Sequence, residues 1–279
     1  MKRLLLTIQY DGSAYHGWQI QNSVKTIQGV IEGVLSRITG EFVRIYGSGR
    51  TDAGVHALGQ RAIFDTRSRL AARDFYKALN ALLPEDIRII DAVEVGMDFH
   101  PRFNALSKRY FYLIYNTSDI NPFLLRYAWH IKYPIDLDIM KQSVVYFKGI
   151  HDFKSFTTNS TVTGSTVREI YDLTITIEKS LGFFGAVQNN VDFIKISVQA
   201  DGFLRYMVRN IVGTLVDVSS GKINKAQRRQ LRPQTSQSVN KKSINQIISA
   251  KDRCAAGIAA PPNGLYLERV FYEDSLMKL

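Results

Sequence analysis

Short segments with the composition of β-strands recur along the whole chain, and they constrain its fold more than any other feature. Residues 167–177 alternate between apolar and polar, as expected for a strand with one buried face. Residues 108–116 are apolar or aromatic on both faces, which is typical of a central strand. Strands are predicted at 3–10, 42–46, 61–65, 87–95, 108–116, 167–177, 192–199 and 265–272.

Helical spacing is clearest in the stripe of apolar residues from Ile27 to Ile38, with Thr26 expected as N-cap and Gly40 as the end. Strands outnumber helices and do not alternate with them one for one. We therefore expect an α+β protein with a mixed, largely antiparallel sheet and helices packed on one face. Further helices are predicted at 73–83, which Pro84 closes, at 137–147 and at 203–218.

Each half of the chain has a similar order of strands and helices, although no residue-level repeat is visible. The best boundary lies near 101–107, which predicts an N-terminal half, 1–105, and a C-terminal half, 106–279. Residues 234–242 are polar and rich in serine and glutamine, so a surface loop is expected there.

Basic residues exceed acidic ones enough to give a net charge of +11. This balance favours a polyanion such as nucleic acid as the partner, although a merely basic soluble protein is the plain alternative. Lysine and arginine are concentrated at Arg61, Arg67, Arg69 and Arg73, at Lys225, Arg228, Arg229 and Arg232, and at Lys241 and Lys242.

Several classes of protein and site are disfavoured. No apolar run reaches the length of about 20 residues that a membrane span needs, and residues 1–10 lack the features of a signal peptide, so a cytoplasmic protein is expected. The single cysteine, Cys254, forms no intrachain disulfide or cysteine zinc site, and we expect it to be a small, semi-buried residue. The five histidines show no zinc spacing, and the glycines near residue 50 fit neither a phosphate loop nor a dinucleotide fingerprint.

One candidate for chemistry remains, the carboxylate of Asp52 in the glycine-rich segment 47–54. A carboxylate is ionised at neutral pH and acts as nucleophile or base without activation. Glycines let the backbone turn sharply and let a bulky substrate approach. Arg50, two residues away, would project to the same side of an extended segment. The alternative is an aspartate that caps its own turn.

Two further patterns involve basic and aromatic residues. Arg205 and Arg209 are four residues apart in the predicted helix 203–218, and Arg209 borders its apolar stripe, so it needs an anionic partner, for which we choose Asp52. The alternative is that both arginines are solvated. In the strand 108–116, aromatics beside basic residues suit base stacking, but the pattern alone favours a core strand.

Together these segments resemble the tRNA pseudouridine synthase A family. The resemblance runs along most of the chain, in five ordered motifs, and implies a pseudouridine synthase fold with two similar halves around a central cleft. The motifs are Tyr10-Asp11-Gly12 with Gly17-Trp18-Gln19, Gly49-Arg50-Thr51-Asp52-Ala53-Gly54-Val55-His56-Ala57, Lys108-Arg109-Tyr110-Phe111-Tyr112, Phe203-Leu204-Arg205-Tyr206-Met207-Val208-Arg209-Asn210 and Ala260-Pro261-Pro262-Asn263-Gly264-Leu265-Tyr266-Leu267.

The resemblance implies a role for each candidate residue. Asp52 matches the catalytic aspartate, and Arg209 the arginine that pairs with it. Tyr110 matches the tyrosine that stacks on the target base and is proposed to move the proton at C5. The remaining matches are Arg50, associated with base flipping, Leu265, which lines the pocket, and Arg205, expected to contact RNA rather than to take part in catalysis.

The implied reaction converts uridine to pseudouridine at positions 38, 39 and 40 in the anticodon arm of tRNA, with no cofactor or metal, in a homodimer. Two other functions remain open from the sequence. A noncatalytic RNA-binding module explains the charge and the aromatics but not the Asp52 segment. A nucleoside or base-excision hydrolase usually needs a second carboxylate or an activated water, and the Asp52 segment holds no second acid.

Overall fold

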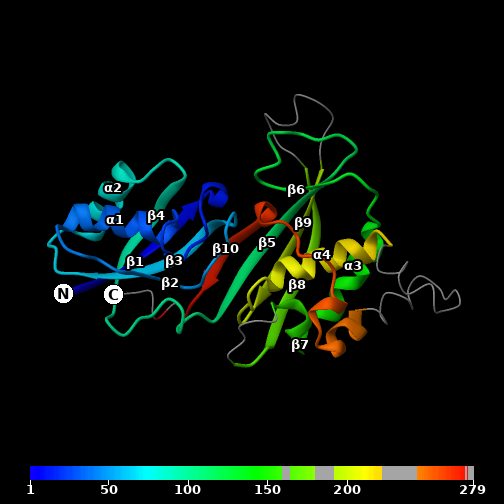
Figure 1. Ribbon diagram of the computed structural model, residues 1–279. Coiled ribbons are helices and arrows are strands. Elements are labelled where there is room, and N and C mark those ends of the chain that lie inside the picture. The colour runs from blue at the N-terminus through cyan, green and yellow to red at the C-terminus, as the bar shows by residue number, and fades with distance from the viewer. Residues whose placement is uncertain (159–163, 180–191, 222–243, 274, 276–279) are drawn as a thin grey trace, which may run out of the picture. The chain divides into compact units, whose positions relative to one another are not determined.

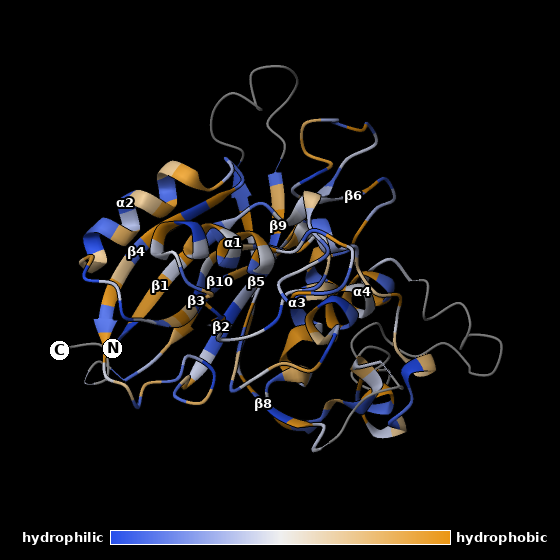
Figure 2. Ribbon diagram, turned by 60° about the vertical axis from the view of Figure 1, so that its left-hand side comes forward, coloured by the Kyte–Doolittle hydropathy of each residue, from blue (hydrophilic) through white to orange (hydrophobic). Residues whose placement is uncertain are grey.

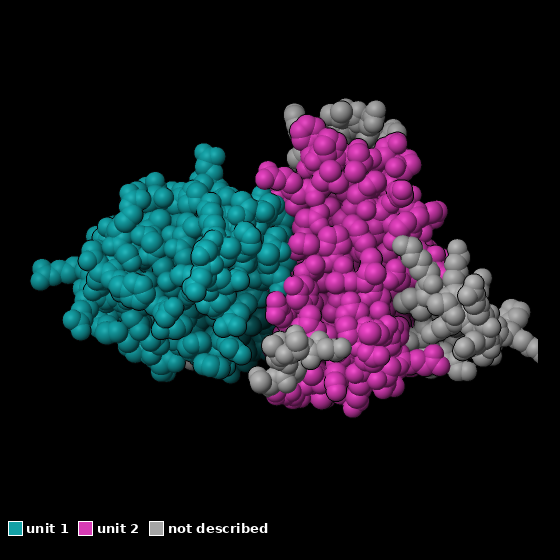
Figure 3. All heavy atoms as spheres, in the orientation of Figure 1, with its two compact units in different colours: residues 1–109, 266–279 teal, residues 110–265 magenta. Residues whose placement is uncertain are grey.

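The computed structural model describes residues 1–158, 164–179, 192–221, 244–273 and 275. These residues form two compact units, one made of 1–109 with 266–279 and the other of 110–265 (Figure 3). The chain passes from one unit to the other within the strands β5 and β10. The first unit thus includes most of the last strand, whereas the sequence predicts that strand in the C-terminal half.

The first unit is a mixed sheet with two helices (Figure 1). Its strands follow the order β4-β1-β3-β10, with the short β2 also paired to β3. β1 is antiparallel to both β3 and β4, whereas β10 is parallel to β3, with Tyr266 opposite His56. The elements are β1 (Lys2–Tyr10), α1 (Ile27–Thr39), β2 (Ile45–Gly47), β3 (His56–Thr66), α2 (Ala72–Leu82), β4 (Ile87–Val95) and β10 (Leu265–Phe271).

Local sequence explains the helix α1 well. The Thr26 hydroxyl accepts a hydrogen bond from the Gly29 amide at 3.3 Å, as an N-cap does, and Gly40 ends the helix in the left-handed conformation with φ 73°. Ile27, Ile31, Val34 and Leu35 of the apolar stripe are buried, whereas Val30 and Ile38 are half-buried. The hydrophobic residues of β1 are buried as well, and Figure 2 shows the hydropathy of both elements along the ribbon. Burial of each such side chain contributes about 1.5–3 kcal/mol, so the stripe holds the helix on the sheet.

In the second unit, the strands follow the order β5-β9-β8-β7, with β6 parallel to β5. β8 is antiparallel to both β7 and β9. The helices α3 and α4 pack against each other, and residues 244–250 are also helical. The elements are β5 (Ser107–Asn116), β6 (Trp129–Ile131), α3 (Leu137–Ser143), β7 (Gly149–Asp152), β8 (Val167–Lys179), β9 (Asp192–Ala200) and α4 (Met207–Ser219).

These elements confirm the expected α+β class with a mixed, mostly antiparallel sheet. Among the described residues, no helix is both long enough and apolar enough to cross a membrane. The predicted loop 234–242, and the basic residues at 225–232, 241 and 242, lie outside the described residues.

Two predictions were wrong. The helix predicted at 203–218 begins only at Met207, because Tyr206 adopts a left-handed conformation with φ 63° that no α-helix continues through. Arg205 therefore precedes α4 and does not share a helical face with Arg209. Cys254 is exposed rather than semi-buried, because it lies in a short 3-10 turn, Arg253–Ala255, that has no buried residue.

Candidate active site

The segment that carries Asp52 runs from the end of β2 to the start of β3 and is held by backbone contacts. The Thr51 carbonyl accepts a hydrogen bond from the Trp18 amide at 3.1 Å, and the Gly54 amide donates to the Tyr15 carbonyl at 3.2 Å. A β-carbon on Gly17 would lie 2.6 Å from the Thr51 oxygen, so only glycine fits there. Residues 15–18 therefore pack directly on the backbone next to Asp52, whose side chain is half-buried.

Buried polar side chains support the same segment. The Tyr10 hydroxyl lies 2.8 Å from the Thr51 hydroxyl, and its burial raises the pKa of that phenol. The Gln60 amide accepts from the Ser48 hydroxyl at 2.8 Å and donates to the Gly49 carbonyl at 2.9 Å. Each of these contacts fixes a residue just before Asp52, so the carboxylate is displayed from a preorganised backbone.

Lys108 adds a charge at the base of this segment. Its ammonium donates to the Ser48 carbonyl at 2.6 Å. Burial, with a smaller contribution from the charge of Arg102, lowers the pKa of Lys108 from 10.5 to about 8. The first residues of β5 thus help to hold the Asp52 segment.

His56 follows the Asp52 segment and is buried at the start of β3. Its Nδ1 lies 3.1 Å from both the Gly12 nitrogen and Asp11 Oδ1, and its ring stacks on Tyr266 at 4.7 Å. These contacts join the turn after β1 to β3 and β10. The histidine therefore contributes to the frame that carries the Asp52 segment.

Arg50 lies on the exposed side of the segment. Its Nε donates to the side-chain oxygen of Gln19 at 2.9 Å. The guanidinium is therefore held from one side, while the rest of it faces outward.

In the second unit, Tyr110 is buried on β5, and its ring meets the ring of Phe203 edge to face at 5.1 Å. Phe111, Tyr112 and Tyr115 are also buried. Phe111, Tyr112 and Tyr115 therefore belong to the core, as the pattern indicated, whereas the stacking of Tyr110 on a base stays a prediction.

Arg209 is half-buried on the first turn of α4. Its Nε donates to the Ala260 carbonyl at 2.7 Å, and the Ala260 amide donates back to the Arg209 carbonyl at 3.0 Å. The ring of Tyr206 lies 4.7 Å from the Arg209 guanidinium and 5.3 Å from that of Arg205. Arg209 is therefore fixed at two points, whereas the Arg205 side chain is exposed.

Residues 253–260 pack along α4 and are hydrogen-bonded to it. The Gly257 amide donates to the Thr214 hydroxyl at 2.9 Å, and the Ile258 amide donates to the Asp217 carboxylate at 3.2 Å. Arg253 donates to the Gly257 carbonyl at 2.8 Å and to the side chain of Asn210 at 2.9 Å. We call residues 253–260 the clamp. Because the clamp is hydrogen-bonded to α4, it fixes the position of the Ala260 carbonyl, which accepts the hydrogen bond from Arg209 Nε.

Leu265 is buried directly after the turn Pro262–Gly264. The Tyr112 hydroxyl donates to the Pro261 carbonyl at 2.7 Å, and a β-carbon on Gly264 would lie 2.6 Å from the Tyr112 ring. The turn is therefore pressed onto β5, and this fixes the position of Leu265.

The candidate residues fall into two groups. Arg50 and Asp52 belong to the first unit, and Tyr110, Arg205, Arg209 and Leu265 to the second. The pairing of Asp52 with Arg209 stays a prediction.

Comparison with known proteins decides the family. A family model described as tRNA pseudouridine synthase matches residues 6–104 and 144–273, which is most of the chain. The chain belongs to this family. The matched ranges include Arg50, Asp52, Arg205, Arg209 and Leu265, whereas Tyr110 lies between them.

Curated relatives of this tRNA pseudouridine synthase family align along nearly the full length. A tRNA pseudouridine synthase A of Caldicellulosiruptor saccharolyticus is 44% identical over 272 residues, covering 98% of this chain and all of the relative. A protein of the same name from Thermoanaerobacter sp. is 40% identical over the same shares. A chain in the crystal structure of a Cbf5-Nop10-Gar1 complex matches 73% of this chain and 52% of its own, at 13% identity and a TM-score of 0.26.

Sequence reasoning missed the polar residues that support the site, chiefly Gln60, which holds Gly49, and Gln28, which accepts a hydrogen bond from Gln19, the residue that receives Arg50. Both are buried, and buried amides are hydrogen-bonded in folded proteins. A signal for Gln28 was present, because Gln28 and Glu32 are four residues apart beside the apolar stripe of α1. No comparable signal marks Gln60, whose partners come from the preceding loop.

Proposed function

We propose that this chain isomerises uridine to pseudouridine in the anticodon arm of tRNA, at positions 38, 39 and 40, with Asp52 as the catalytic residue. The observation that carries the proposal is the family match over nearly the whole chain, in which Asp52 stands on a segment held from several sides. The relatives' own name, tRNA pseudouridine synthase A, supports tRNA as the substrate.

The reaction breaks the bond between N1 of uracil and C1′ of the ribose and forms a bond from C5 to the same carbon. The proton at C5 is removed, and N1 ends with a proton, so no atom or electron is gained or lost. Asp52 acts at the ribose, either as nucleophile on C1′ or as base for a ribose proton. Because a preorganised carboxylate needs little reorganisation, the hydrogen-bonded segment around Asp52 favours either step.

The other candidate residues bind the RNA or its target base, or hold the catalytic carboxylate. Tyr110 stacks on the target base and serves the proton transfer at C5, and Arg209 pairs with the Asp52 carboxylate. Arg50 helps to extrude the base, and Leu265 lines the pocket that retains detached uracil. Arg205, exposed before α4, contacts the RNA backbone.

The overall charge suits this work. Extruding a base from a stem takes a few kcal/mol, which contacts between phosphates and basic side chains can offset. With a net charge of +11, the chain is expected to bind tRNA in a salt-dependent way. We further propose that it acts in the cytoplasm as a homodimer in which one tRNA contacts both subunits.

The test uses unmodified tRNA transcripts that carry uridine at 38, 39 or 40, incubated with the protein in the presence of a chelator. Pseudouridine mapped at these positions, with no free uracil released, is the expected result. Binding without modification would indicate a noncatalytic module, and release of uracil would indicate a hydrolase. Either outcome contradicts the proposal. Light scattering on the free protein and on its tRNA complex tests the homodimer.

A further inference from the structure

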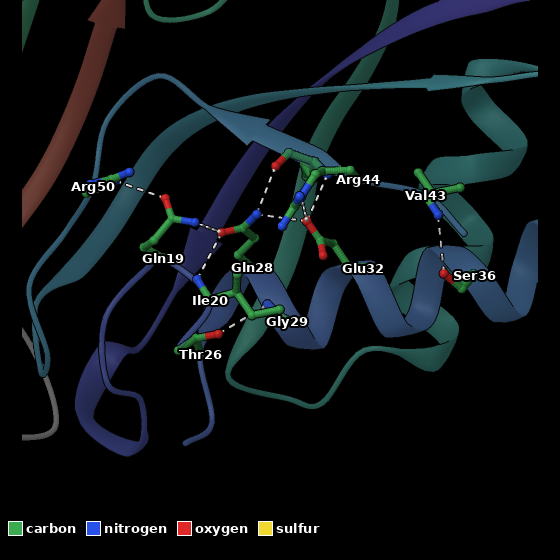
Figure 4. A network of polar contacts seen from close by, with 11 residues as sticks. Gln19, Ile20, Thr26, Gln28, Gly29, Glu32, Ser36, Val43, Arg44 and Arg50 are labelled. Carbon is green, nitrogen blue, oxygen red and sulfur yellow. Dashed lines mark hydrogen bonds and ion pairs between the residues drawn. The ribbon is translucent and has the colours of Figure 1, made fainter. Parts of the chain in front are cut away.

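A chain of polar side chains leads from Arg50 into the interior of the first unit (Figure 4). Arg50 Nε donates to Gln19 Oε1 at 2.9 Å, and Gln19 Nε2 donates to Gln28 Oε1 at 2.6 Å. Gln28 Nε2 then donates to Glu32 Oε1 at 2.8 Å. We call Gln19, Gln28 and Glu32 the amide relay.

Backbone groups decide which way the Gln28 amide points. Its oxygen accepts a hydrogen bond from the Ile20 amide at 2.9 Å, and its nitrogen donates to the Ile45 carbonyl at 3.2 Å. A backbone N–H only donates and a carbonyl only accepts, so a reversed amide would face two mismatched groups. The Gln28 oxygen must therefore point toward Gln19.

The orientation of Gln28 sets that of Gln19. Because the Gln28 oxygen is an acceptor, Gln19 turns its NH₂ group inward and its oxygen outward. That outward oxygen is the acceptor presented to the Arg50 guanidinium. A guanidinium has donors only, so an outward NH₂ group would repel it.

Burial makes the inner part of the relay rigid. Gln28 is 3% exposed and Glu32 is 6% exposed. Glu32 Oε1 also accepts from the Ile45 amide at 3.1 Å, and Arg44 lies 3.9 Å from it on the outer side. Buried polar groups that lose a partner are strongly penalised, so Gln28 has little freedom to turn.

We propose that Gln28 is a positioning residue for Arg50 and acts on it through Gln19. The inference rests on the proposed function, in which Arg50 helps to extrude the target base. Gln28 touches no substrate. It fixes the polarity of the relay, and the relay holds one edge of the guanidinium so that its remaining donors face outward.

The experiment measures single-turnover pseudouridine formation at saturating enzyme, together with the Kd for tRNA. Gln28→Met keeps most of the side-chain volume and removes all four hydrogen bonds of its amide. Gln19→Met removes the Arg50 contact from a partly exposed site. The matched control is Ser36→Ala on the same helix, because Ser36 also accepts a backbone amide, that of Val43 at 3.4 Å, but has no link to Arg50 (Figure 4).

Both methionine variants are expected to lower the single-turnover rate by about tenfold with little change in Kd, because the loss concerns orientation rather than affinity. Ser36→Ala should keep the wild-type rate. In Arg50→Ala, adding Gln28→Met should cause no further loss, since the relay acts only through Arg50. A substrate whose target uridine is mismatched should recover much of the lost rate, because less unstacking is needed.

Independent, multiplicative losses in the Arg50→Ala and Gln28→Met double variant would overturn the inference. So would a wild-type rate in Gln19→Met, which also decides the matter if Gln28→Met fails to fold. These outcomes require an active wild-type protein. An inactive wild type would contradict the proposed function instead, so the two failures are distinguishable.

Discussion

Gly213 on α4 gives a sharp test of how the site is supported. A β-carbon at this position would lie 1.7 Å from the Ile258 carbonyl oxygen and 2.8 Å from its carbonyl carbon. Both are backbone atoms, which no side-chain rotation removes. In Gly213→Ala, the closer distance must grow from 1.7 Å to at least 3.0 Å, so the segment around Ile258 has to move away from α4.

The size of the effect follows from what that movement disturbs. Inserting a methyl group into a well-packed interior costs about 1–3 kcal/mol, and the helix preference for alanine returns about 1 kcal/mol. The clamp contributes hydrogen bonds from Gly257, Ile258 and Ala260 to α4, each worth about 0.5–1.5 kcal/mol. Weakening some of them brings the net destabilisation to about 2 kcal/mol.

The assay is urea unfolding, paired with single-turnover pseudouridine formation. Gly33→Ala is the matched control, because Gly33 is exposed in the middle of α1 and a β-carbon there meets nothing within 4 Å. This control should gain up to about 1 kcal/mol and keep its rate. Gly213→Ala should lose both stability and rate, since the Ala260 carbonyl that receives Arg209 moves.

If Gly213→Ala were as stable as the wild type, or more stable, the reasoning would be refuted, because the clamp could then move away from α4 without loss of stability. The comparison requires that Gly33→Ala shows the expected gain in stability, since this control measures the effect of the added methyl group on helix preference alone. A stable Gly213→Ala variant with a full rate would further show that Arg209 does not depend on residues 258–260.

Three further predictions concern the supports of the site. Folding lowers the pKa of Lys108 to about 8, so the folded chain binds fewer protons than the unfolded one between pH 8 and 10.5. Measured by urea unfolding, the stability of the wild type relative to Lys108→Met should therefore rise over that interval, by at most about 3 kcal/mol. A stability difference that does not change with pH would contradict this. Tyr10→Phe leaves the buried Thr51 hydroxyl without this partner and should lower the unfolding free energy by about 1 kcal/mol and slow the reaction, whereas unchanged stability would show that the bond is unimportant. Arg253→Met removes the donors to the Gly257 carbonyl and to the Asn210 side chain, so thermal unfolding should show a loss of about 2 kcal/mol. An unfolding midpoint equal to that of the wild type would show that these bonds do not stabilise the clamp.

How well the sequence predicts an element depends on whether its determinants are local. The ends of α1 could be placed because Thr26 and Gly40 act on their own helix. The start of α4 could not, since residues 203–206 have helical composition, and the backbone just before the left-handed Tyr206 is held by a tertiary contact, the Thr157 hydroxyl that donates to the Arg205 carbonyl at 3.1 Å.

The same distinction holds for the site. Asp52 and its glycines stand together in the sequence and could be singled out directly. Gln60 and Lys108 support the same segment through tertiary contacts, which spacing along the chain does not reveal. The family resemblance supplied candidate roles for single residues, and the described contacts supply the physical means by which those residues are held.

The central claim is that the carboxylate of Asp52 performs the reaction while the rest of the protein binds and orients the RNA. The most direct measurement compares wild type with Asp52→Asn on one tRNA transcript, following pseudouridine at positions 38–40 and tRNA affinity in the same preparation. The expected result is no detectable product from Asp52→Asn with affinity close to wild type. Pseudouridine formed by Asp52→Asn at the wild-type rate would contradict the account.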